Sequence, residues 1–412
     1  MTYIDAGFSD LPAEWELKSL SSVAEIWNTK RAPLNALERV SKKGIYPYCG
    51  ANGIVDHIDE YRFDGEYVLI AEDGGHWGRN EQSSYIMSGK FWVNNHAHII
   101  SAISEISQNM FLSSAINYMD ISPLISGDSR GKLTKSILVK LLLPIPPLDE
   151  QQRIIKVLTT VQNAIALQER LIVLTSELKR ALMHKLFSEG LRREKQKQTD
   201  IGLVPESWGI MELGKAVEYI DYGFSAPIPK ILPKNGVKIV STADINKSGK
   251  LLYGQIRQID APAKTVEQLS LKDGDVLFNW RNSPELIGKT TVFEEQDEPH
   301  IFASFILRVR CDEKQYHNYF LKYLLNHFRE EGIFVRLSRR AVNQANYNRN
   351  ELASLKIPVP KYNEQTEMAE TIGVVESNLK IYENKRNLLQ ELFHTLLHQL
   401  MTAQIRVNDM EL

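Results

Sequence analysis

The sequence lacks several features that would place it in a common class of protein. Only two cysteines, Cys49 and Cys311, occur among its 412 residues, too few for a disulfide framework or a four-cysteine zinc site. It has no uninterrupted run of about 18 apolar residues and no charged-then-apolar leader, so we expect neither a membrane span nor a secretory signal, and a cytoplasmic location. The formal net charge is only −2, so any surface for nucleic acid must be a local basic patch.

Catalytic signatures are also scarce. The stretch SPELIGKT at 283–290 approaches a phosphate-binding loop, but Ser283 occupies the first glycine position and no strand-glycine turn precedes it. His96 and His98 would lie on one face of a strand, but no third ligand is evident, so hydrogen-bonded roles in a sheet explain them better than a metal site. The sequence contains no G-x-G-x-x-G and no Asn-Pro-Pro or Asp-Pro-Pro tetrapeptide of an amino-methyltransferase. We therefore expect a chain with no catalytic residues and no metal.

The chain does contain an internal repeat, in which one sequence pattern occurs twice. Matching residues occur in the same order in both halves: Pro12 and Pro205, Trp15 and Trp208, Leu20 and Leu213, Val68 and Val276, Phe111 and Phe320, Asn117 and Asn326, Glu150 and Glu364, His184 and His398. The offset between matched residues grows through the first part of each copy and is constant from the Glu150–Glu364 pair onward. Each copy is therefore a module of variable length followed by a rod of fixed length.

A proline-rich stretch followed by an acid-amide cluster marks the start of each rod. The two stretches are IPPLDEQQRII at 145–155 and VPKYNEQTEMA at 359–369. We expect Asp149 and Asn363 to be the N-caps, with Gln152 completing a capping box in the first copy. Apolar residues then recur at helical spacing, namely Ile154, Val157, Val161, Ala164, Leu171, Leu174, Leu178 and Leu182, and in the second copy Met368, Ile372, Val375, Leu379, Leu388, Leu392 and Leu396. Each predicted helix has about 40 residues and is roughly 60 Å long.

The two apolar stripes predict that the helices pack on each other. Only the short segment 191–207 separates Gly190, the expected end of the first helix, from Trp208 in the second module. A parallel pair would need a return path of roughly 60 Å, at no more than about 3.5 Å per residue, so we expect an antiparallel, coiled-coil-like pair. The alternative is that each helix packs on its own module. The predicted fold class is thus α+β, with two pseudo-repeated, mixed β-rich modules separated by two long antiparallel helices.

Within the modules, we predict strands at 66–71, at 91–95 and 97–101, and at 137–143 in the first, and at 237–241, 274–280 and 301–310 in the second. A helix is expected around 109–119 in the first module and around 319–328 in the second. Neither pattern is that of a doubly wound nucleotide-binding fold.

Loops in both modules carry side chains suited to reading DNA. Arginine can bind guanine O6 and N7, asparagine and glutamine can bind adenine N6 and N7, and lysine can hold phosphates. The densest group lies at 336–350; its alternative explanation is a solvated turn with surface arginines. The DNA-binding candidates are Trp77, Arg79, Asn80, Arg130, Lys132, Lys135, Trp280, Arg281, Asn282, Arg336, Arg339, Arg340, Asn343, Gln344, Asn346 and Arg349.

Five stretches together carry a resemblance to a known family. They are PPLDEQ at 146–151, PKYNEQ at 360–365, YPYCGANGI at 46–54, DGEYVLI at 64–70 and VNNHAHII at 93–100. With the two-copy layout, they make essentially the whole chain resemble the specificity subunit of type I restriction-modification systems. The second copy departs from the pattern, because PKYNEQ lacks the second proline and nothing in the second module matches GANGI or NHAHI. DNA-contacting residues therefore cannot be transferred from one module to the other.

The resemblance implies a division of labour. Target-recognition domains would occupy 1–146 and 204–360, conserved spacer helices 147–190 and 361–406, and a linker 191–203. Each domain would read one half of a bipartite site in double-stranded DNA, and helix length would fix the unread spacer. Two methyltransferase (M) subunits and the restriction/translocase (R) subunits would be the partners. S-adenosylmethionine, ATP and Mg would be bound by those partners, which leaves this chain without a cofactor or a catalytic role.

Two other classes stay open from the residues alone. One is a self-contained methyltransferase or nuclease with degenerate motifs, which would modify or cut DNA by itself. The other is a protein-interaction scaffold built on the paired helices, which would give no site-specific protection of DNA with partners present.

Overall fold

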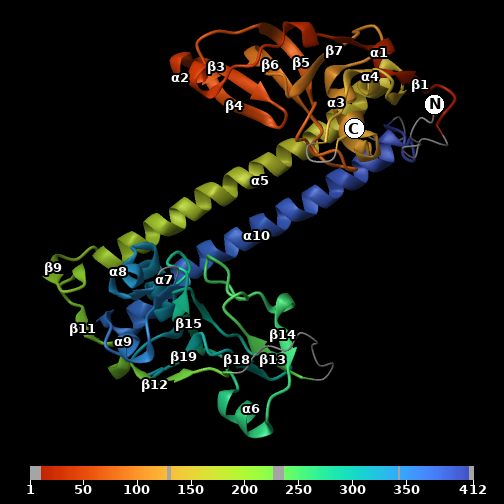
Figure 1. Cartoon of the computed structure of the whole chain (residues 1–412). Helices are drawn as coiled ribbons and strands as arrows, with labels where there is room; N and C mark the ends of the chain where they lie inside the picture. Colours follow the sequence, from red (N-terminus) through yellow and green to blue (C-terminus); the bar gives the residue numbers. More distant parts are fainter. Residues whose placement is uncertain (1–10, 128–130, 226–235, 342–343, 408–412) are drawn as a thin grey trace. The chain divides into compact units, whose positions relative to one another are not determined.

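The computed structural model describes residues 11–127, 131–225, 236–341 and 344–407. The chain forms two compact units, with residues 1–170 and 383–412 in unit 1 and residues 171–382 in unit 2. Each of the two long helices, α5 (Leu148–Glu189) and α10 (Tyr362–Met401), contributes one half to each unit (Figure 1).

Unit 1 is built on a six-stranded sheet in the order β2-β7-β5-β6-β3-β4. All neighbours are antiparallel except β3 and β6, which run parallel. The strands are β2 (Ala24–Ile26), β3 (Lys43–Gly50), β4 (Gly53–Ile58), β5 (Phe63–Ala71), β6 (Ser84–Val93) and β7 (Ala97–Ala102). A separate antiparallel pair joins β1 (Glu16–Ser19) to β8 (Leu142–Ile145).

The central strand β5 is buried on both faces, which explains its continuous apolar run. Val68 and Ile70 belong to a core shared with helix α3 (Asn109–Tyr118), whereas Leu69 belongs to a second core on the other side of the sheet. Alternate residues of a strand point to opposite faces, so one short sequence serves two cores. The remaining helices of unit 1 are α1 (Leu20–Val23), α2 (Ala36–Ser41) and α4 (Lys135–Leu138).

Unit 2 contains smaller sheets with different connections. The main sheet has the order β12-β19-β15-β17, and two three-stranded sheets have the orders β14-β13-β18 and β16-β21-β20. Their strands are β12 (Val217–Tyr222), β13 (Val237–Val240), β14 (Arg257–Ile259), β15 (Val276–Asn279), β16 (Arg281–Asn282), β17 (Thr290–Val292), β18 (His300–Phe302), β19 (Ile306–Cys311), β20 (Arg339–Ala341) and β21 (Gln344–Asn346). Helix α7 (Asn318–Glu330) packs on the main sheet, and α6 (Ala263–Leu269), α8 (Ile333–Leu337) and α9 (Arg349–Ala353) are short.

The duplication predicted from the sequence is confirmed by equivalent contacts. In unit 2, β11 (Gly209–Glu212) pairs with β22 (Lys356–Val359) as β1 pairs with β8 in unit 1. The amide of Asn117 on α3 makes two hydrogen bonds to the backbone of Ser84. The amide of Asn326 on α7 makes the same two to Thr290. Both copies thus fix their helix to their sheet in the same way.

The long helices run antiparallel, as predicted. Within unit 1, Ile154 near the start of α5 shares a core with Leu397 near the end of α10. Within unit 2, Phe187 near the end of α5 shares a core with Ile372 near the start of α10. Gly190 ends α5 with φ +66°, the left-handed conformation typical of a helix stop, and its N–H donates to the carbonyl of Leu186 at 3.0 Å.

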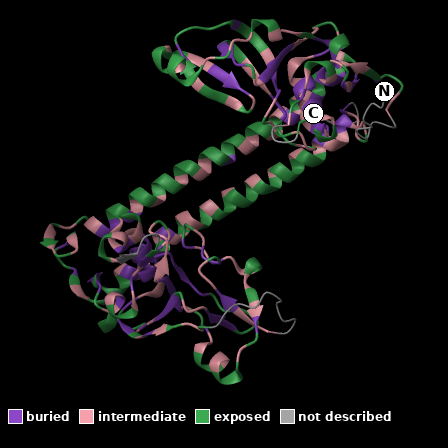
Figure 2. Cartoon of the chain, in the orientation of Figure 1, coloured by how far each residue is buried: buried purple, intermediate pink, exposed green. Residues whose placement is uncertain are grey.

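The predicted pairing of the helices holds, but their apolar stripes are not covered along the whole length. Leu178 is 56% exposed and Leu388 is 65% exposed, and Leu174 and Leu392 are exposed as well. Figure 2 shows this exposed middle of both helices in green, between buried ends. The helix ends are buried because they complete the cores of the two units, so the alternative of packing on the modules holds at the ends.

Three local predictions also need correction. The predicted strand at 137–143 is the end of α4 followed by β8, because a short apolar run does not distinguish helix from strand. The predicted linker at 191–203 contains β9 (Gln196–Thr199), which pairs with β10 (Gly202–Pro205). Asp149 and Asn363 are not N-caps, since each helix begins one residue earlier and both residues lie in its first turn. Among the described residues, no helix has the length and hydropathy needed to cross a membrane.

Candidate nucleic-acid interface

The Glu-Gln pair at each helix start ties the helix to its unit. The side-chain amide of Gln151 donates to the carbonyls of Pro146 and Ile106, both at 2.9 Å. Gln365 donates in the same way to Pro360 at 3.0 Å and to Gln315 at 3.1 Å. Pro147 and Lys361 serve as the N-caps, because their carbonyls accept the first helical hydrogen bonds. Sequence reasoning had given the capping role to the neighbouring Asp149 and Asn363.

The preceding glutamate binds the tryptophan that opens each copy. The indole N–H of Trp15 donates to Glu150 at 3.0 Å, and that of Trp208 donates to Glu364 at 3.3 Å. In unit 1 the same carboxylate also accepts hydrogen bonds from Arg406 at 2.6 and 2.9 Å. The Trp and Glu positions that recur in the sequence are therefore bonded partners in the structure, and they fix where each helix leaves its module.

In unit 2, the structure brings two separate candidate stretches onto one small sheet. Arg281 and Asn282 form β16, which pairs with β21, so that Arg281 lies opposite Asn346. Strand β20, which contains Arg339 and Arg340, pairs with the other edge of β21. The two stretches lie far apart in the sequence, and neither of them alone predicts the pairing.

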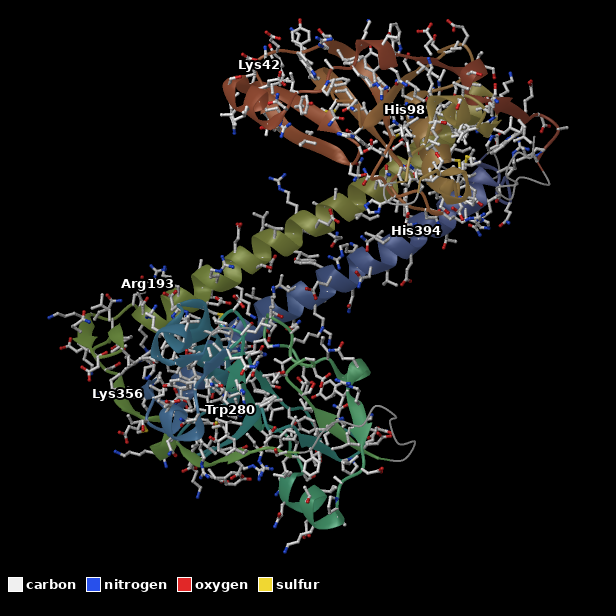
Figure 3. All side chains as sticks on the ribbon, in the orientation of Figure 1. Lys42, His98, Arg193, Trp280, Lys356 and His394 are labelled. Carbon is white, nitrogen blue, oxygen red and sulfur yellow. The ribbon has the colours of Figure 1, made fainter. Side chains whose placement is uncertain are left out.

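An aromatic row supports this small sheet. Trp280 meets Tyr222 edge-on at 5.4 Å and Phe305 at 6.4 Å between ring centroids, and its indole N–H donates to the Ser304 carbonyl at 2.7 Å. The guanidinium of Arg281 lies over the Phe305 ring at 5.1 Å. Figure 3 labels Trp280 at this position. Tyr222 and Phe305 are partly exposed and were missed from the sequence. Phe305 lies in the turn between β18 and β19 and has no charged neighbour to mark it.

The other candidates of unit 2 have local partners. Arg336 on α8 donates to the Glu331 carbonyl at 2.7 Å. Asn282 accepts from the backbone N–H of Ser283 at 2.9 Å. Arg349 begins α9 with an exposed side chain, and its backbone N–H donates to the Tyr222 hydroxyl at 3.1 Å.

Several candidates of unit 1 have partners within the fold. Trp77 packs against the core, and Arg79 lies over the Tyr118 ring at 5.3 Å. Asn80 adopts a positive φ of 61°. Lys132 forms an ion pair with Glu72 at 3.0 Å, and Lys135 is exposed at the start of α4. Arg130 and Asn343 lie outside the described residues.

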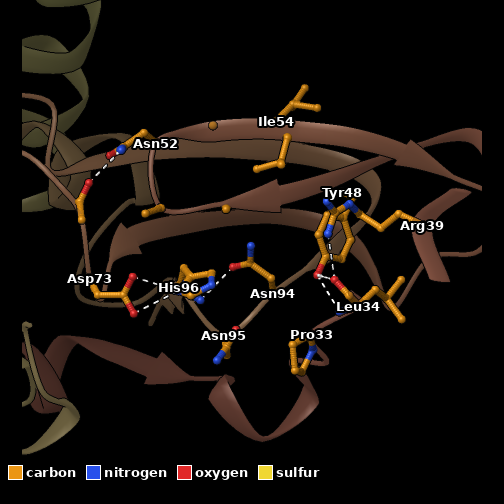
Figure 4. Close-up of a pocket in the computed structure, with 15 residues that line it drawn as sticks. Pro33, Leu34, Arg39, Tyr48, Asn52, Ile54, Asp73, Asn94, Asn95 and His96 are labelled. Carbon is orange, nitrogen blue, oxygen red and sulfur yellow. Dashed lines mark hydrogen bonds and ion pairs between the residues drawn. The ribbon is translucent and has the colours of Figure 1, made fainter. Parts of the chain in front are cut away.

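A cavity of about 510 Å³ in unit 1 gathers polar groups that sequence reasoning did not select. It lies between the tip of the β3–β4 hairpin and the loops that follow β5 and β6 (Figure 4). The Asp73 carboxylate accepts from the His96 Nδ1 atom at 2.8 Å, and the Asn94 amide oxygen accepts from the His96 backbone N–H at 2.7 Å. Asn52 donates to the Gly74 carbonyl at 2.9 Å. The cavity thus presents amide and imidazole groups of the kind that bind base edges.

Two buried ionisable residues, Glu72 and His98, have hydrogen-bond partners near this cavity. His98 donates from Nε2 to the Leu133 carbonyl at 2.7 Å and accepts at Nδ1 from Asn28 at 2.8 Å. Burial lowers the pKa of His98, which favours the neutral imidazole. Burial opposes the charge of Glu72, but hydrogen bonds from Arg31 and Lys132 lower its pKa overall. His98 has the hydrogen-bonded role in the sheet that was expected, whereas His96 lies in the turn between β6 and β7, so the two imidazoles do not share the face of a strand. The described residues contain no group of three potential metal ligands.

Known proteins share this organisation along the whole chain. The family model of the type I restriction modification DNA specificity domain matches residues 12–175 and again residues 205–391. A putative type I restriction enzyme specificity subunit of Haemophilus influenzae, S.HindORF215P, is 30% identical over 94% of this chain and 98% of its own length. The MjaVIII specificity subunit of Methanocaldococcus jannaschii is 24% identical over 97% and 95%, respectively.

Solved structures show the same fold. The type I restriction-modification S subunit of M. genitalium aligns with a TM-score of 0.63 at 14% identity, covering 94% of this chain and 96% of that one. A chain from a study of type I complex assembly aligns with a TM-score of 0.51 at 16% identity, covering 96% and 100%. The chain therefore belongs to the family of type I restriction-modification specificity subunits, which are non-catalytic, and carries two copies of the target-recognition domain.

Proposed function

We propose that unit 1 and unit 2 each read one half of a bipartite site in double-stranded DNA. The observation that carries this proposal is a shared scaffold with two different surfaces. The Trp-Glu, Gln-carbonyl and Asn-backbone contacts recur in both copies. The sheets do not recur, since one unit has a six-stranded sheet with a polar cavity and the other a small arginine-bearing sheet. The two modules are attached to the long helices by the same contacts but differ in their sheets. Such an arrangement suits a DNA site whose two halves differ in sequence.

The domain limits proposed from the sequence follow this division. Target-recognition domains occupy 1–146 and 204–360, and the helices between and after them set the unread spacer. Rigid helices suit that task because each residue adds a constant rise of about 1.5 Å. Half-site centres on the order of one DNA turn apart, about 10 base pairs, would suit a ruler of this kind.

The exposed middle of the helices is the proposed docking surface for two methyltransferase subunits. Exposed apolar residues follow one stripe on each helix, namely Leu167, Leu174 and Leu178 on α5 and Val374, Ile381, Leu388 and Leu392 on α10. Seven-residue spacing is the pattern by which helices pack against further helices. Apolar stripes of this kind on a protein surface mark binding sites for partners.

The chemistry of the complex would be carried by those partners. The methyltransferase subunits would bind S-adenosylmethionine and flip the target adenine, and the restriction/translocase subunits would use ATP and Mg. This chain would set the register of the complex on DNA and bind none of these cofactors.

The test is methylation mapping in a methylation-free host. The chain would be expressed with the methyltransferase gene that accompanies it, and each gene alone would serve as the control. We expect methyladenine at a single two-part motif only when both genes are present. Modification by this chain alone would make it an enzyme, and unmodified DNA in every combination would favour the scaffold.

A further inference from the structure

One arginine of the small sheet in unit 2 is held in a single orientation without being neutralised. The Nε and Nη2 atoms of Arg281 donate to the same oxygen, Oε1 of Gln344, at 3.1 and 2.8 Å. The face of the guanidinium rests on Phe305. Strand pairing between β16 and β21 fixes both backbones. A flat group with one edge bonded and one face covered retains little rotational freedom.

The arginines of the neighbouring main sheet differ in this respect. Arg308 binds Asp221 at 3.0 Å, and Arg310 binds Asp275 through two hydrogen bonds of 2.7 Å. The charges of Arg308 and Arg310 are therefore neutralised by carboxylates within the fold. Arg281 forms no ion pair with a carboxylate among the described residues, so its charge remains available for a ligand.

The hydrogen bonds of Arg281 leave one edge of the guanidinium for a ligand. Of its five N–H groups, two point to Gln344. The three others are on Nη1 and Nη2, and they include the terminal pair of parallel donors. Two parallel donors match the O6 and N7 acceptors of guanine in the major groove and no other base edge there. An adenine presents one donor and one acceptor on the same edge.

We propose that Arg281 reads a guanine in the half-site recognised by unit 2, with Gln344 and Phe305 as positioning residues. Gln344, which the sequence suggested as a base reader, is thereby assigned to orienting Arg281. This inference rests on the proposed function and adds the identity of one base and of the group that reads it.

The experiment compares methylation motifs of complexes that carry variants of this chain. The wild-type complex should methylate a motif whose second half contains a G·C pair. Arg281→Ala and Arg281→Lys should both lose preference at one G·C position by tenfold or more, because lysine keeps the charge but not the planar fork. The half-site read by unit 1 should be unchanged. Arg257→Ala, at an exposed arginine of β14, is the matched control and should leave the whole motif intact.

The positioning role has its own readout. Gln344→Leu removes the acceptor oxygen that orients Arg281 and should weaken guanine preference at the same position as Arg281→Lys. Gln344→Glu keeps an acceptor oxygen but adds a carboxylate that would neutralise Arg281, so it should weaken guanine preference as well. A thermal unfolding curve and assembly with the methyltransferase identify any variant that fails to fold, in which case the lysine variant decides the question.

The outcomes separate the two ideas. A wild-type complex that methylates no bipartite motif removes the proposed function itself. A wild-type motif with no G·C pair in its second half, or an Arg281→Lys complex with an unchanged motif and rate, overturns the assignment of Arg281 and leaves the proposed function standing.

Discussion

Single side chains decide how firmly each long helix is anchored. Gln365 is fully buried and uses its side chain three times, with two donated hydrogen bonds and one accepted from the His317 N–H at 2.8 Å. Burying such groups without partners costs about 1 to 3 kcal/mol each.

We therefore expect Gln365→Leu to destabilise unit 2 by about 2 to 4 kcal/mol, because it leaves two carbonyls and one N–H buried and unpaired. Urea unfolding of the purified chain would measure the loss. Gln390→Leu, at an exposed position of the same helix, is the control and should change stability by less than about 0.5 kcal/mol. Equal effects of the two substitutions would contradict the anchoring role.

A second residue-scale prediction concerns acid stability. Glu376 of α10 accepts hydrogen bonds from Lys179 of α5 and from Lys322 and Tyr323 of α7, at 2.7, 2.7 and 2.9 Å. Burial opposes its ionisation, but Lys322 and Lys179 outweigh that effect and lower the pKa of Glu376 from 4.5 to about 2. A lowered pKa means that the unfolded chain binds the proton first. The stabilisation is therefore complete above pH 4.5 and is lost as the pH falls towards 2.

The expected contribution is on the order of 3 kcal/mol at neutral pH. Unfolding curves recorded between pH 2 and pH 7 should show Glu376→Gln less stable than the natural chain at neutral pH and equal to it near pH 2. Glu367→Gln, at an exposed site of the same helix, should follow the natural chain throughout. A constant difference across the pH range would disprove the linkage.

At the scale of elements, the role of the unit 1 cavity in DNA recognition can be tested. His96 follows β6, and Asp73 orients its imidazole. The His96 side chain is 41% exposed, and Asp73 is the partner that loses a hydrogen bond when the imidazole is removed. We expect His96→Ala to reduce methylation by tenfold or more and to alter the motif only in the half read by unit 1. His57→Ala on β4, outside the cavity, is the control. A changed second half-site would show that the cavity does not serve unit 1 alone.

The structure brings some of the candidate residues together and leaves others bound within the fold, and the elements show why. The composition of 336–350 and of 279–285 pointed to arginine and amide groups, and these do meet on one sheet. In unit 1 the same reasoning chose Trp77 and Lys132, which have partners in the fold. It did not choose the Asn94–His96 loop as a DNA contact, although that loop lies in the VNNHAHII stretch, because composition does not show that β3 pairs with β6 and closes a cavity there.

At the scale of the whole molecule, the helices allow one further test. Inserting four matched residues into the exposed middle of both α5 and α10 adds roughly one helical turn, about 6 Å. We expect the spacer of the methylated motif to grow by about two base pairs, given about 3.4 Å per base pair, with both half-sites unchanged. The same insertion in α5 alone should abolish methylation, since the ends of the two helices would no longer match. An unchanged spacer after the paired insertion would contradict the ruler role of the helices.

The sequence by itself determined what depends on local pattern and repetition. The two copies, the start of both helices to within a residue or two, and their antiparallel direction follow from spacing and linker length, although the second helix ends at Met401 and not at the predicted residue 406. Only the tertiary structure decided which distant strands pair, that Gln344 orients Arg281, and that the helix stripes are covered at their ends and open in the middle. The physical reason is that the periodicity of a helix can be recognised from residues only a few positions apart in the sequence. Strand pairing and burial depend instead on segments that lie far apart in the chain, whose contacts no single stretch encodes.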